Sequence, residues 1–491
     1  MAPMATLLRC LPLLLLPLAC GSPEPAARPN VLLITVDTLR ADRLGFHGHG
    51  RDTSPALDGL AERGLVFERA YAPSPWTLPS MASIHTGLYP SSHGLKRPKD
   101  AIPPEARTLA EVLDQAGYRT DSIVSNPLVH PRFGHSQGFE SFDTKDAKGH
   151  DHVSTPGITE RALALLDGYA AAPEGEPFFL SLLYFDPHYD WRSHGRGFAA
   201  EGTVGRITGE ESIEHLRDLA AAEGSLTGAE VQQLVDCYDE EIAFTDEGIG
   251  ELLDALERLG LAEDTLVVLT ADHGEEFLEH GWLGHTRFLY EGMVHVPLVV
   301  ADPREPSSHG LRVRTPVSTV SVMPTVLELV GLDPELHGPD EPSLAELVSR
   351  PAAIAGLDGG RKPGNAEAAG LDPRIDGVVF SEVDFVPAQE KNLAKVAHLV
   401  GVIERGVLGQ RGDVGEDLPG PARDAQRTVD APPAGLEDRP KISAPEPDQP
   451  PLPPQARVRP SVGRPPPRPA VPRRGKRTRS TARRGPPRRW V

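Results

Sequence analysis

VLLITVD, residues 31–37, is the stretch that determines the fold we expect for this chain. Leu and β-branched residues follow one another without a charged side chain until Asp37 ends the run. A strand with one solvated face alternates apolar and polar residues, whereas a strand covered on both faces is apolar almost throughout. The stretch therefore predicts a buried strand of a parallel sheet, with an acid at its carboxyl end.

Further stretches of this kind follow, separated by segments with helical spacing. Strands are predicted at YRTDSIVSNP, PFFLSLLYFDPH, TLVVLTADHG and HVPLVVADP, and helices at SPALDGLAERG, RTLAEVLDQAG and about residues 229–259. This alternation predicts an α/β domain whose sheet is mostly parallel and carries helices on both faces. Such sheets bind ligands beyond the carboxyl ends of their strands, where we expect Asp37, Asp186, Asp272 and His273.

The segment SPWTLPSMASIHTG, residues 74–87, places a hydroxyl at the predicted start of a helix. Thr77 precedes Leu78 and Pro79, an arrangement that suits a helix N-cap with Pro in the first turn. The same helix start offers backbone N–H groups to an anion. On these residues alone, Thr77 is either a plain cap or a nucleophile.

The polar residues at the strand ends suit a divalent metal. Two Asp and one His form an oxygen-rich ligand set that favours Zn²⁺ or Mn²⁺. A metal would also activate a hydroxyl, because coordination lowers its pKa and fixes the attacking oxygen. Each residue has a structural alternative, which is a turn for Asp37 and the Asp272-His273 pair and a surface loop for His188.

The net charge of −20 is unevenly distributed along the chain. Residues 451–491 contain 13 Lys and Arg and no acid, so the remainder carries about −33. An acidic body argues against nucleic-acid binding and is compatible with an enzyme that concentrates positive charge at a metal.

The N-terminus has the pattern of an export signal. Arg9 precedes LPLLLLPLA, which is too short to span a membrane and stops at Cys20. The Leu-Ala-Cys-Gly ending resembles a bacterial lipoprotein signal, in which Cys20 is acylated. We therefore expect a periplasmic, lipid-anchored protein; ordinary cleavage would leave a soluble exported one.

Composition divides the chain into five parts. The expected parts are a signal peptide (1–20), a tether (21–28), the main domain (29–350), a linker with a small C-terminal remnant (351–396), and a largely disordered Pro/Arg-rich tail (397–491). VVFSEVDFV (378–386) is expected to form a strand of the remnant. The end of the tail is a basic arm or the product of a shifted reading frame.

Several motifs occur in a familiar order: RPNVLLITVDTLRADRLG, WTLPSMASIHTGLYPSSHG, LYFDPHYDW, LVVLTADHGEEFLEHG and MPTVLELVGL. From about Pro29 to Leu332 the chain resembles the sulfatase family of the alkaline phosphatase-like superfamily. In the family signature C-x-P-S-R-x4-T-G the first position is the nucleophile, and here it falls on Thr77. The main domain is then a catalytic domain.

The resemblance also implies roles for other residues. It makes Asp37, Thr77, Asp272 and His273 the ligands of one divalent metal, with Mn²⁺ or Zn²⁺ favoured over Ca²⁺ or Mg²⁺. It makes Thr77 the nucleophile, with His188 and His285 contacting the ester oxyanion or the leaving group. Asp186 would hold its loop or orient His188, and whether Asp186, His188 and His285 form a second metal site stays open. Glu275 and Glu276 would support the site without contacting substrate.

Two positions, Thr77 and Met81, depart from the signature, and each bears on the reaction that the protein could catalyse. Thr cannot be converted to formylglycine, so a covalent Thr77 ester would be opened by water or by an acceptor alcohol. Thr at this position, with His273 where aldehyde-type sulfatases have Asn, resembles the phosphodiesterases and phosphoethanolamine transferases of the superfamily. Met81 replaces the signature Arg, a loss that typically costs about 10²–10³ in rate.

We therefore expect a metal-dependent hydrolase of sulfate or phosphate esters, with a preference for phosphoryl esters. Its substrate would be a small molecule, a glycan or a lipid, and no nucleic-acid partner is expected. The alternatives are an envelope phosphoethanolamine-type transferase and a catalytically inactive envelope binding protein.

Overall fold

The structure is a computed structural model that describes residues 28–149, 152–173, 175–209, 211–222, 225–358, 372, 374–375, 378–385, 397–404 and 407–413. The predicted signal peptide, Cys20 with its predicted acylation, and nearly all of the tether lie outside the described residues.

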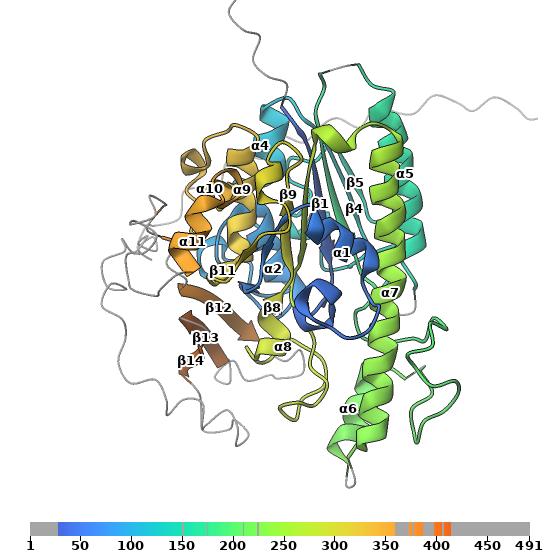
Figure 1. Ribbon diagram of the computed structural model, residues 1–491. Helices are drawn as coiled ribbons and strands as arrows, with labels where there is room; N and C mark the ends of the chain where they lie inside the picture. The colour runs from blue at the N-terminus through green and yellow to red at the C-terminus, as the bar shows by residue number, and fades with distance from the viewer. Residues whose placement is uncertain are drawn as a thin grey trace, which may run out of the picture. The chain divides into compact units, whose positions relative to one another are not determined.

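An eight-stranded mixed sheet forms the centre of the main domain (Figure 1). Its strands lie in the order β10-β2-β9-β7-β1-β6-β4-β5. Their bounds are β1 Asn30–Val36, β2 Leu65–Phe67, β4 Arg119–Val124, β5 Ser141–Asp143, β6 Phe178–Tyr184, β7 Thr265–Ala271, β9 Leu298–Ala301 and β10 Arg312–Val313.

The predicted mostly parallel arrangement is confirmed. β1 pairs in parallel with β6 and β7, and β4 pairs in parallel with β5 and β6. β9, predicted within HVPLVVADP, runs antiparallel to both β7 and β2. The parallel strands bring their carboxyl ends to one edge of the sheet, which is where the predicted polar tips lie.

Alternate residues of β1 face two separate apolar cores. Leu32, Ile34 and Val36 pack with α1, α5 and α7, whereas Val31 and Leu33 pack with α2, α4 and α9. The sheet is therefore covered on both faces, as the unbroken apolar run predicts.

The helices of the described structure have the following bounds: α1 Pro55–Glu62, α2 Thr77–Thr86, α3 Pro90–His93, α4 Leu109–Gln115, α5 Thr155–Ala170, α6 Ile213–Ala221, α7 Gly228–Arg258, α8 Glu291–Val294, α9 Val322–Leu329, α10 Ala345–Ser349 and α11 Ala352–Asp358.

The long helix α7 matches the predicted segment and begins with a reciprocal cap. The Glu230 backbone N–H donates to the Thr227 hydroxyl, and the Thr227 N–H donates to the Glu230 carboxylate. Such a capping box pairs two backbone donors that no helical carbonyl can reach. Nowhere in the described ranges is there a helix both long and apolar enough to cross a membrane.

Two small sheets complete the described structure. One contains β11 (Val317–Ser318), β3 (Ala70–Tyr71) and β8 (His295–Val296). The other is antiparallel and contains β12 (Val378–Phe385), β13 (Ala397–Glu404) and β14 (Val407–Asp413). β12 is the strand expected in VVFSEVDFV, and β13 and β14 lie inside the segment for which we expect disorder. Residues 414–491 lie outside the described residues.

Candidate active site

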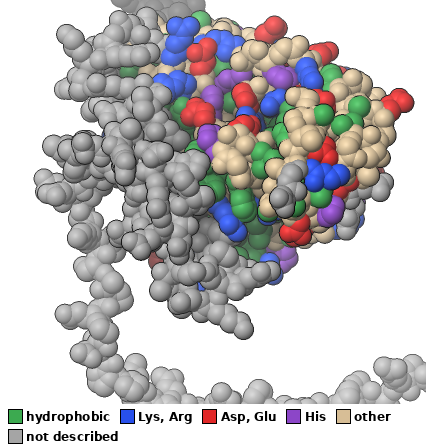
Figure 2. Space-filling view, turned by 90° about the horizontal axis from the view of Figure 1, so that it is seen from below, with side chains coloured by type: hydrophobic (Ala, Val, Ile, Leu, Met, Phe, Trp, Pro, Cys, Tyr) green, Lys and Arg blue, Asp and Glu red, His purple; other side chains and the backbone are tan. Residues whose placement is uncertain are grey.

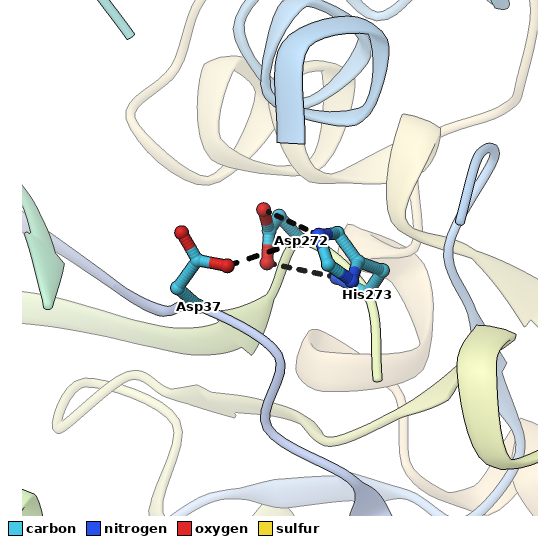
Figure 3. Close-up of side chains that lie close together, drawn as sticks. All are labelled: Asp37, Asp272 and His273. Carbon is cyan, nitrogen blue, oxygen red and sulfur yellow. Dashed lines mark hydrogen bonds and ion pairs between the residues drawn. The ribbon is translucent and has the colours of Figure 1, made fainter. Parts of the chain in front are cut away.

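Asp37, Asp272 and His273 form a buried cluster at the carboxyl ends of β1 and β7. One ligand atom from each lies within 4.8 Å of the others, and all three residues are fully buried. Figure 3 shows Asp37 on one side of the cluster, facing Asp272 and His273. The structure thus brings together three of the four residues expected to hold the metal.

Strand register explains why these residues meet. Val36 of β1 lies opposite Ala271 of β7 in a parallel pair, so the residue after each strand emerges beside the other. The Thr38 backbone N–H then donates to Asp272 Oδ1 over 3.2 Å. Thr38 itself has φ 55°, an uncommon conformation for a residue other than Gly, and its carbonyl accepts from the Tyr238 hydroxyl at 2.7 Å. Backbone strain of this kind is found at functional sites.

The His273 ring is held in one orientation by its own backbone neighbour. Its Nδ1 lies 2.9 Å from the Gly274 carbonyl, which can only accept, so Nδ1 carries the proton. Nε2 is therefore left with a lone pair, which is the form that ligates metals. Gly274 is required by close packing, because a Cβ there would lie 2.1 Å from the Gly292 carbonyl oxygen.

The carboxylates of the cluster carry unused acceptor capacity. Asp37 Oδ1 and Asp272 Oδ2 are buried and accept no hydrogen bond. Burial, with the neighbouring Asp272 carboxylate, raises the pKa of Asp37 well above its usual value, and burial also raises the pKa of Asp272. Buried anions of this kind are normally paired or bound to a metal. The residues therefore fit a divalent cation, and their mixed oxygen and imidazole donors suit Zn²⁺ or Mn²⁺.

Thr77 is placed in the cluster by the start of α2. Its Oγ1 lies 3.3 Å from His273 Nε2, and the residue is 1% exposed. The expected N-cap role is wrong: the capping residue is Trp76, α2 begins at Thr77, and neither side chain caps the helix. The helix therefore starts at Thr77 itself, one residue earlier than expected, and Trp76 before it is extended, with φ −162°. The Thr77 hydroxyl is thus directed to the site instead of the helix end.

Asn126 is a site residue that the sequence reasoning missed. Its Nδ2 donates to Asp37 Oδ2 at 2.5 Å and to Thr77 Oγ1 at 3.2 Å, and the side chain is 2% exposed. The Leu128 N–H donates to Asn126 Oδ1 at 2.8 Å, which orients the amide so that its N–H groups face the site. Asn126 lies near the end of the predicted strand YRTDSIVSNP, but nothing in that stretch predicts its contact with Thr77.

Met81 belongs to the apolar core and not to the polar site. It is 1% exposed and packs in the same cluster as Val31 and Leu33. The position at which the family signature has Arg therefore brings no charge or hydrogen bond to Thr77.

His285 lies beside His273 on a strained loop. The two ring centroids are 4.5 Å apart, and His285 Nδ1 lies 3.0 Å from Glu275 Oε1. Its neighbour Thr286 has φ 92°, and the Thr286 N–H donates to the Pro75 carbonyl at 3.1 Å. Burial raises the pKa of Glu275 well above its usual value. Glu275 thereby fixes the His285 ring and directs its Nε2 away from the carboxyl group.

His188 and Asp186 have different surroundings. The His188 ring lies 4.8 Å from the His285 ring and stacks on Phe185. The Asp186 carboxylate accepts from the backbone N–H groups of Ser154 and Thr155, at the start of α5. Asp186 therefore holds its loop to α5, the first of the two roles expected for it. Among the described residues, Asp37, Asp272 and His273 are the only group of three or more acidic, His or Cys side chains close enough to share a metal.

Viewed from the end at which α6 and α8 lie, basic, acidic and histidine side chains are interspersed over the surface (Figure 2). No single sign of charge dominates the part of this face that the described residues form.

The fold and the site together define an α/β ester hydrolase of the alkaline phosphatase-like type. The family model described as Sulfatase matches residues 29–332, and the chain belongs to that family. It is accordingly a sulfatase-like ester hydrolase.

Several relatives share this family. The chain is 26% identical over 332 residues to an arylsulfatase of Clostridium perfringens, covering 56% of this chain and 69% of the relative. It is 28% identical over 390 residues to the multifunctional alkaline phosphatase superfamily protein PehA of Trinickia caryophylli, covering 62% and 74%. The phosphonate monoester hydrolase of Agrobacterium radiobacter has a similar fold, with a TM-score of 0.61 and 20% identity, covering 78% of this chain and 87% of that one.

Proposed function

We propose that the protein hydrolyses sulfate or phosphate esters by way of a covalent ester on Thr77. The observation that carries this proposal is the position of Thr77 Oγ1, 3.3 Å from His273 Nε2 and 3.2 Å from Asn126 Nδ2, at the edge of the buried Asp-Asp-His cluster. A hydroxyl with no structural role in its own helix, directed at a cluster of metal-ligand type, has the surroundings of a nucleophile.

Asp37, Thr77, Asp272 and His273 would hold one divalent cation. When bound, the cation would lower the pKa of the Thr77 hydroxyl and neutralise charge that develops on the transferred group. The acceptor oxygens Asp37 Oδ1 and Asp272 Oδ2 and the lone pair of His273 Nε2 support this assignment. Thr in place of Cys means that no formylglycine takes part.

The first chemical step forms one bond and breaks one. Thr77 Oγ1, after its hydroxyl proton is released to solvent, attacks phosphorus or sulfur in line, and the bond from that atom to the leaving oxygen breaks. Asn126 Nδ2 donates to Thr77 Oγ1 and to Asp37, so its N–H groups lie where the oxyanion would develop. The start of α2 adds backbone N–H groups to this cradle.

His285 is the group best placed to protonate the leaving oxygen. Glu275 Oε1 binds its Nδ1 at 3.0 Å, which fixes the ring and leaves Nε2 for substrate. His188, whose ring is 4.8 Å from that of His285, would contact the same leaving group. In the second step water attacks the Thr77 ester, and His285 accepts the proton of that water.

The preference for phosphoryl over sulfuryl esters rests on two positions. Thr77 replaces the Cys of the aldehyde-type signature, and His273 stands where those sulfatases have Asn. Both support phosphoryl chemistry with Mn²⁺ or Zn²⁺. An inactive binding protein is the second candidate, and the observation that favours it is the apolar burial of Met81. Transfer to an acceptor alcohol would use the same Thr77 ester.

The test compares the wild type with the Thr77→Ala variant on aryl sulfate, phosphate monoester and phosphodiester substrates. The proposal expects at least a 10³-fold loss in kcat for Thr77→Ala on the best substrate. Thr325→Ala is a matched control, because Thr325 is also buried but its hydroxyl bonds only to the backbone groups of Ser321 and Leu344. Equal rates for wild type and Thr77→Ala on all substrates would leave the inactive binding protein as the better explanation. A preference for aryl sulfate would overturn the phosphoryl assignment.

We also propose that the protein is exported and anchored by an acylated Cys20. The support is the leader sequence, which lies outside the described residues. A protein that partitions with membranes as wild type and is released to the periplasm as Cys20→Ala would support the anchor. Equal partitioning of both forms would contradict it.

A further inference from the structure

Arg217 of α6 lies next to the loop that carries His285. A Cβ on Gly284 would be 2.3 Å from Arg217 Nη2, and Gly284 directly precedes His285. Gly284 has φ 92°, so this close approach depends on a residue without a side chain. The guanidinium thus lies against the backbone that presents His285.

Three contacts fix the plane of this guanidinium. Arg217 Nε donates to the Leu283 carbonyl at 2.8 Å. Its Cζ lies 4.8 Å from the Trp282 ring centroid and 5.8 Å from that of Tyr189. Tyr189 is itself stacked on His285, with ring centroids 5.0 Å apart. A guanidinium held in this way loses little freedom when its remaining N–H groups bind an anion.

Arg217 has no acidic partner among the residues that the structure describes, since no carboxylate oxygen lies within 4.0 Å of it. Two other half-buried arginines have acidic partners, since Arg51 is paired with Asp239 and Arg161 with Asp146. An Arg whose plane is fixed but whose Nη groups have no acid to bind is suited to an anion from outside.

We propose that Arg217, Tyr189 and Trp282 form a subsite for a ring-shaped leaving group that carries its own negative charge. The ring would pack against Tyr189 and Trp282, and its anionic substituent would bind the Nη groups of Arg217. Because Tyr189 stacks on His285, this subsite continues directly from the group proposed to protonate the leaving oxygen. The inference rests on the proposed function and names the class of substrate: sulfate or phosphate esters of anionic sugars or anionic aromatic alcohols.

The experiment uses pairs of esters whose leaving groups differ in charge, and Arg217→Gln controls for the accompanying difference in leaving-group acidity. Phenyl phosphate is compared with its 3- and 4-carboxyphenyl and 4-sulfophenyl analogues, and the corresponding sulfates are run in parallel. We expect wild type to favour the better anionic ester over the phenyl ester by about 10–100-fold in kcat/KM, and Arg217→Gln to abolish this preference. The carboxyl and sulfonate arms distinguish which kind of anion is bound.

Burial raises the pKa of Glu275, and the positive charge of Arg217 partly offsets that rise. An effect of Arg217→Gln on the rate could therefore arise through Glu275 instead of through the leaving group. If Arg217 acts only through Glu275 and His285, Arg217→Gln will slow the charged and uncharged esters equally, and that result would overturn the subsite. Arg63→Gln is the matched control, because Arg63 is paired with Glu257 on the α1 and α7 surface. It should leave both rates and their ratio unchanged.

A binding measurement separates this inference from the proposed chemistry. Calorimetric titration with 3- and 4-hydroxybenzoate and with phenol requires no turnover. Tighter binding of either hydroxybenzoate by wild type and Thr77→Ala, lost in Arg217→Gln, would establish the subsite even if no ester were hydrolysed. Equal binding of hydroxybenzoates and phenol by wild type would overturn it, even if Thr77 proved to be the nucleophile.

Discussion

Thr77 Oγ1 lies 3.3 Å from Nε2 of His273, and these atoms come from the start of a helix and the end of a strand that are 196 residues apart in the sequence. β7 places His273 beside Asp37, and α2 brings Thr77 into the same cluster. A hydroxyl therefore lies within a set of side chains of metal-ligand type.

Asn126→Ala should lower kcat by about 10²-fold, because it removes the donor to both Thr77 Oγ1 and Asp37 Oδ2. The thermal midpoint should also fall, because the variant leaves the Leu128 N–H without the acceptor that Asn126 Oδ1 provides. Steady-state kinetics and thermal unfolding of the same preparations check both parts. A variant with wild-type kcat would remove Asn126 from the proposed oxyanion cradle.

His285→Ala should slow esters of poor leaving groups far more than esters of 4-nitrophenol. The physical reason is that an alkoxide needs a proton as the bond breaks, whereas 4-nitrophenolate leaves without one. His280→Ala is the matched control, because His280 forms a comparable pair with Glu276 at 3.0 Å but stacks on Tyr290 and not on the site. An equal loss on both ester types would show that His285 does not act on the leaving group.

Removal of divalent metal with a chelator should abolish activity and lower the thermal midpoint, and Mn²⁺ or Zn²⁺ should restore both. A ligand at 100 times its Kd stabilises the folded state by about 2.7 kcal/mol. Elemental analysis should find one metal per chain in wild type and much less in Asp272→Asn. Asp302→Asn, a buried acid paired with Arg304 away from the cluster, should keep its metal. Full metal content in Asp272→Asn would contradict the ligand assignment.

Acid should destabilise the fold through a set of buried histidines at α2. Burial lowers the pKa of His85 to about 4 and that of His93 to about 4, and lowers that of the adjacent His135 as well. The folded state keeps these rings neutral, whereas the unfolded chain takes up protons below about pH 6.5. Stability is therefore complete above that pH and is lost as pH falls toward 4, by about 3 kcal/mol for His85.

Urea unfolding at pH 7.5 and 5.0 measures this effect. His85→Leu should lose less stability between the two pH values than wild type, because both ring nitrogens of His85 are buried without hydrogen-bond partners. His215→Gln, on the exposed surface of α6, should behave as wild type. An unchanged pH dependence in His85→Leu would contradict the account.

The sequence was sufficient to predict the sheet edge but not all of the site. Asp37 and Asp272 could be foreseen because each ends an apolar strand, and parallel strands place such ends together. Asn126 could not, because its contact with Thr77 depends on the position of β4 next to β6, which no local pattern reveals. The cap at Trp76 was missed for another reason: hydroxyl residues before Pro usually cap helices, and the extended Trp76 backbone has no signature of its own.

The loop that carries His285 shows a similar limit. The resemblance to the family implied a role for His285, but the pairing with Glu275 ten residues earlier depends on the conformation of Gly284 and Thr286. A left-handed conformation at Thr286 runs against the preference of a β-branched residue, so it could not be read from the residue type. Strain of this kind is imposed by the surrounding structure.

The central claim is that Thr77 becomes esterified during turnover, and mass spectrometry of the quenched enzyme tests it most directly. Protein mixed with its best substrate, quenched in acid and digested should yield the peptide containing residues 74–87 with the added mass of one phosphoryl or sulfo group. Fragmentation should place that group on Thr77, and Thr77→Ala should not acquire it. Turnover with no modified peptide under single-turnover conditions, or a modification located at another residue, would contradict the account.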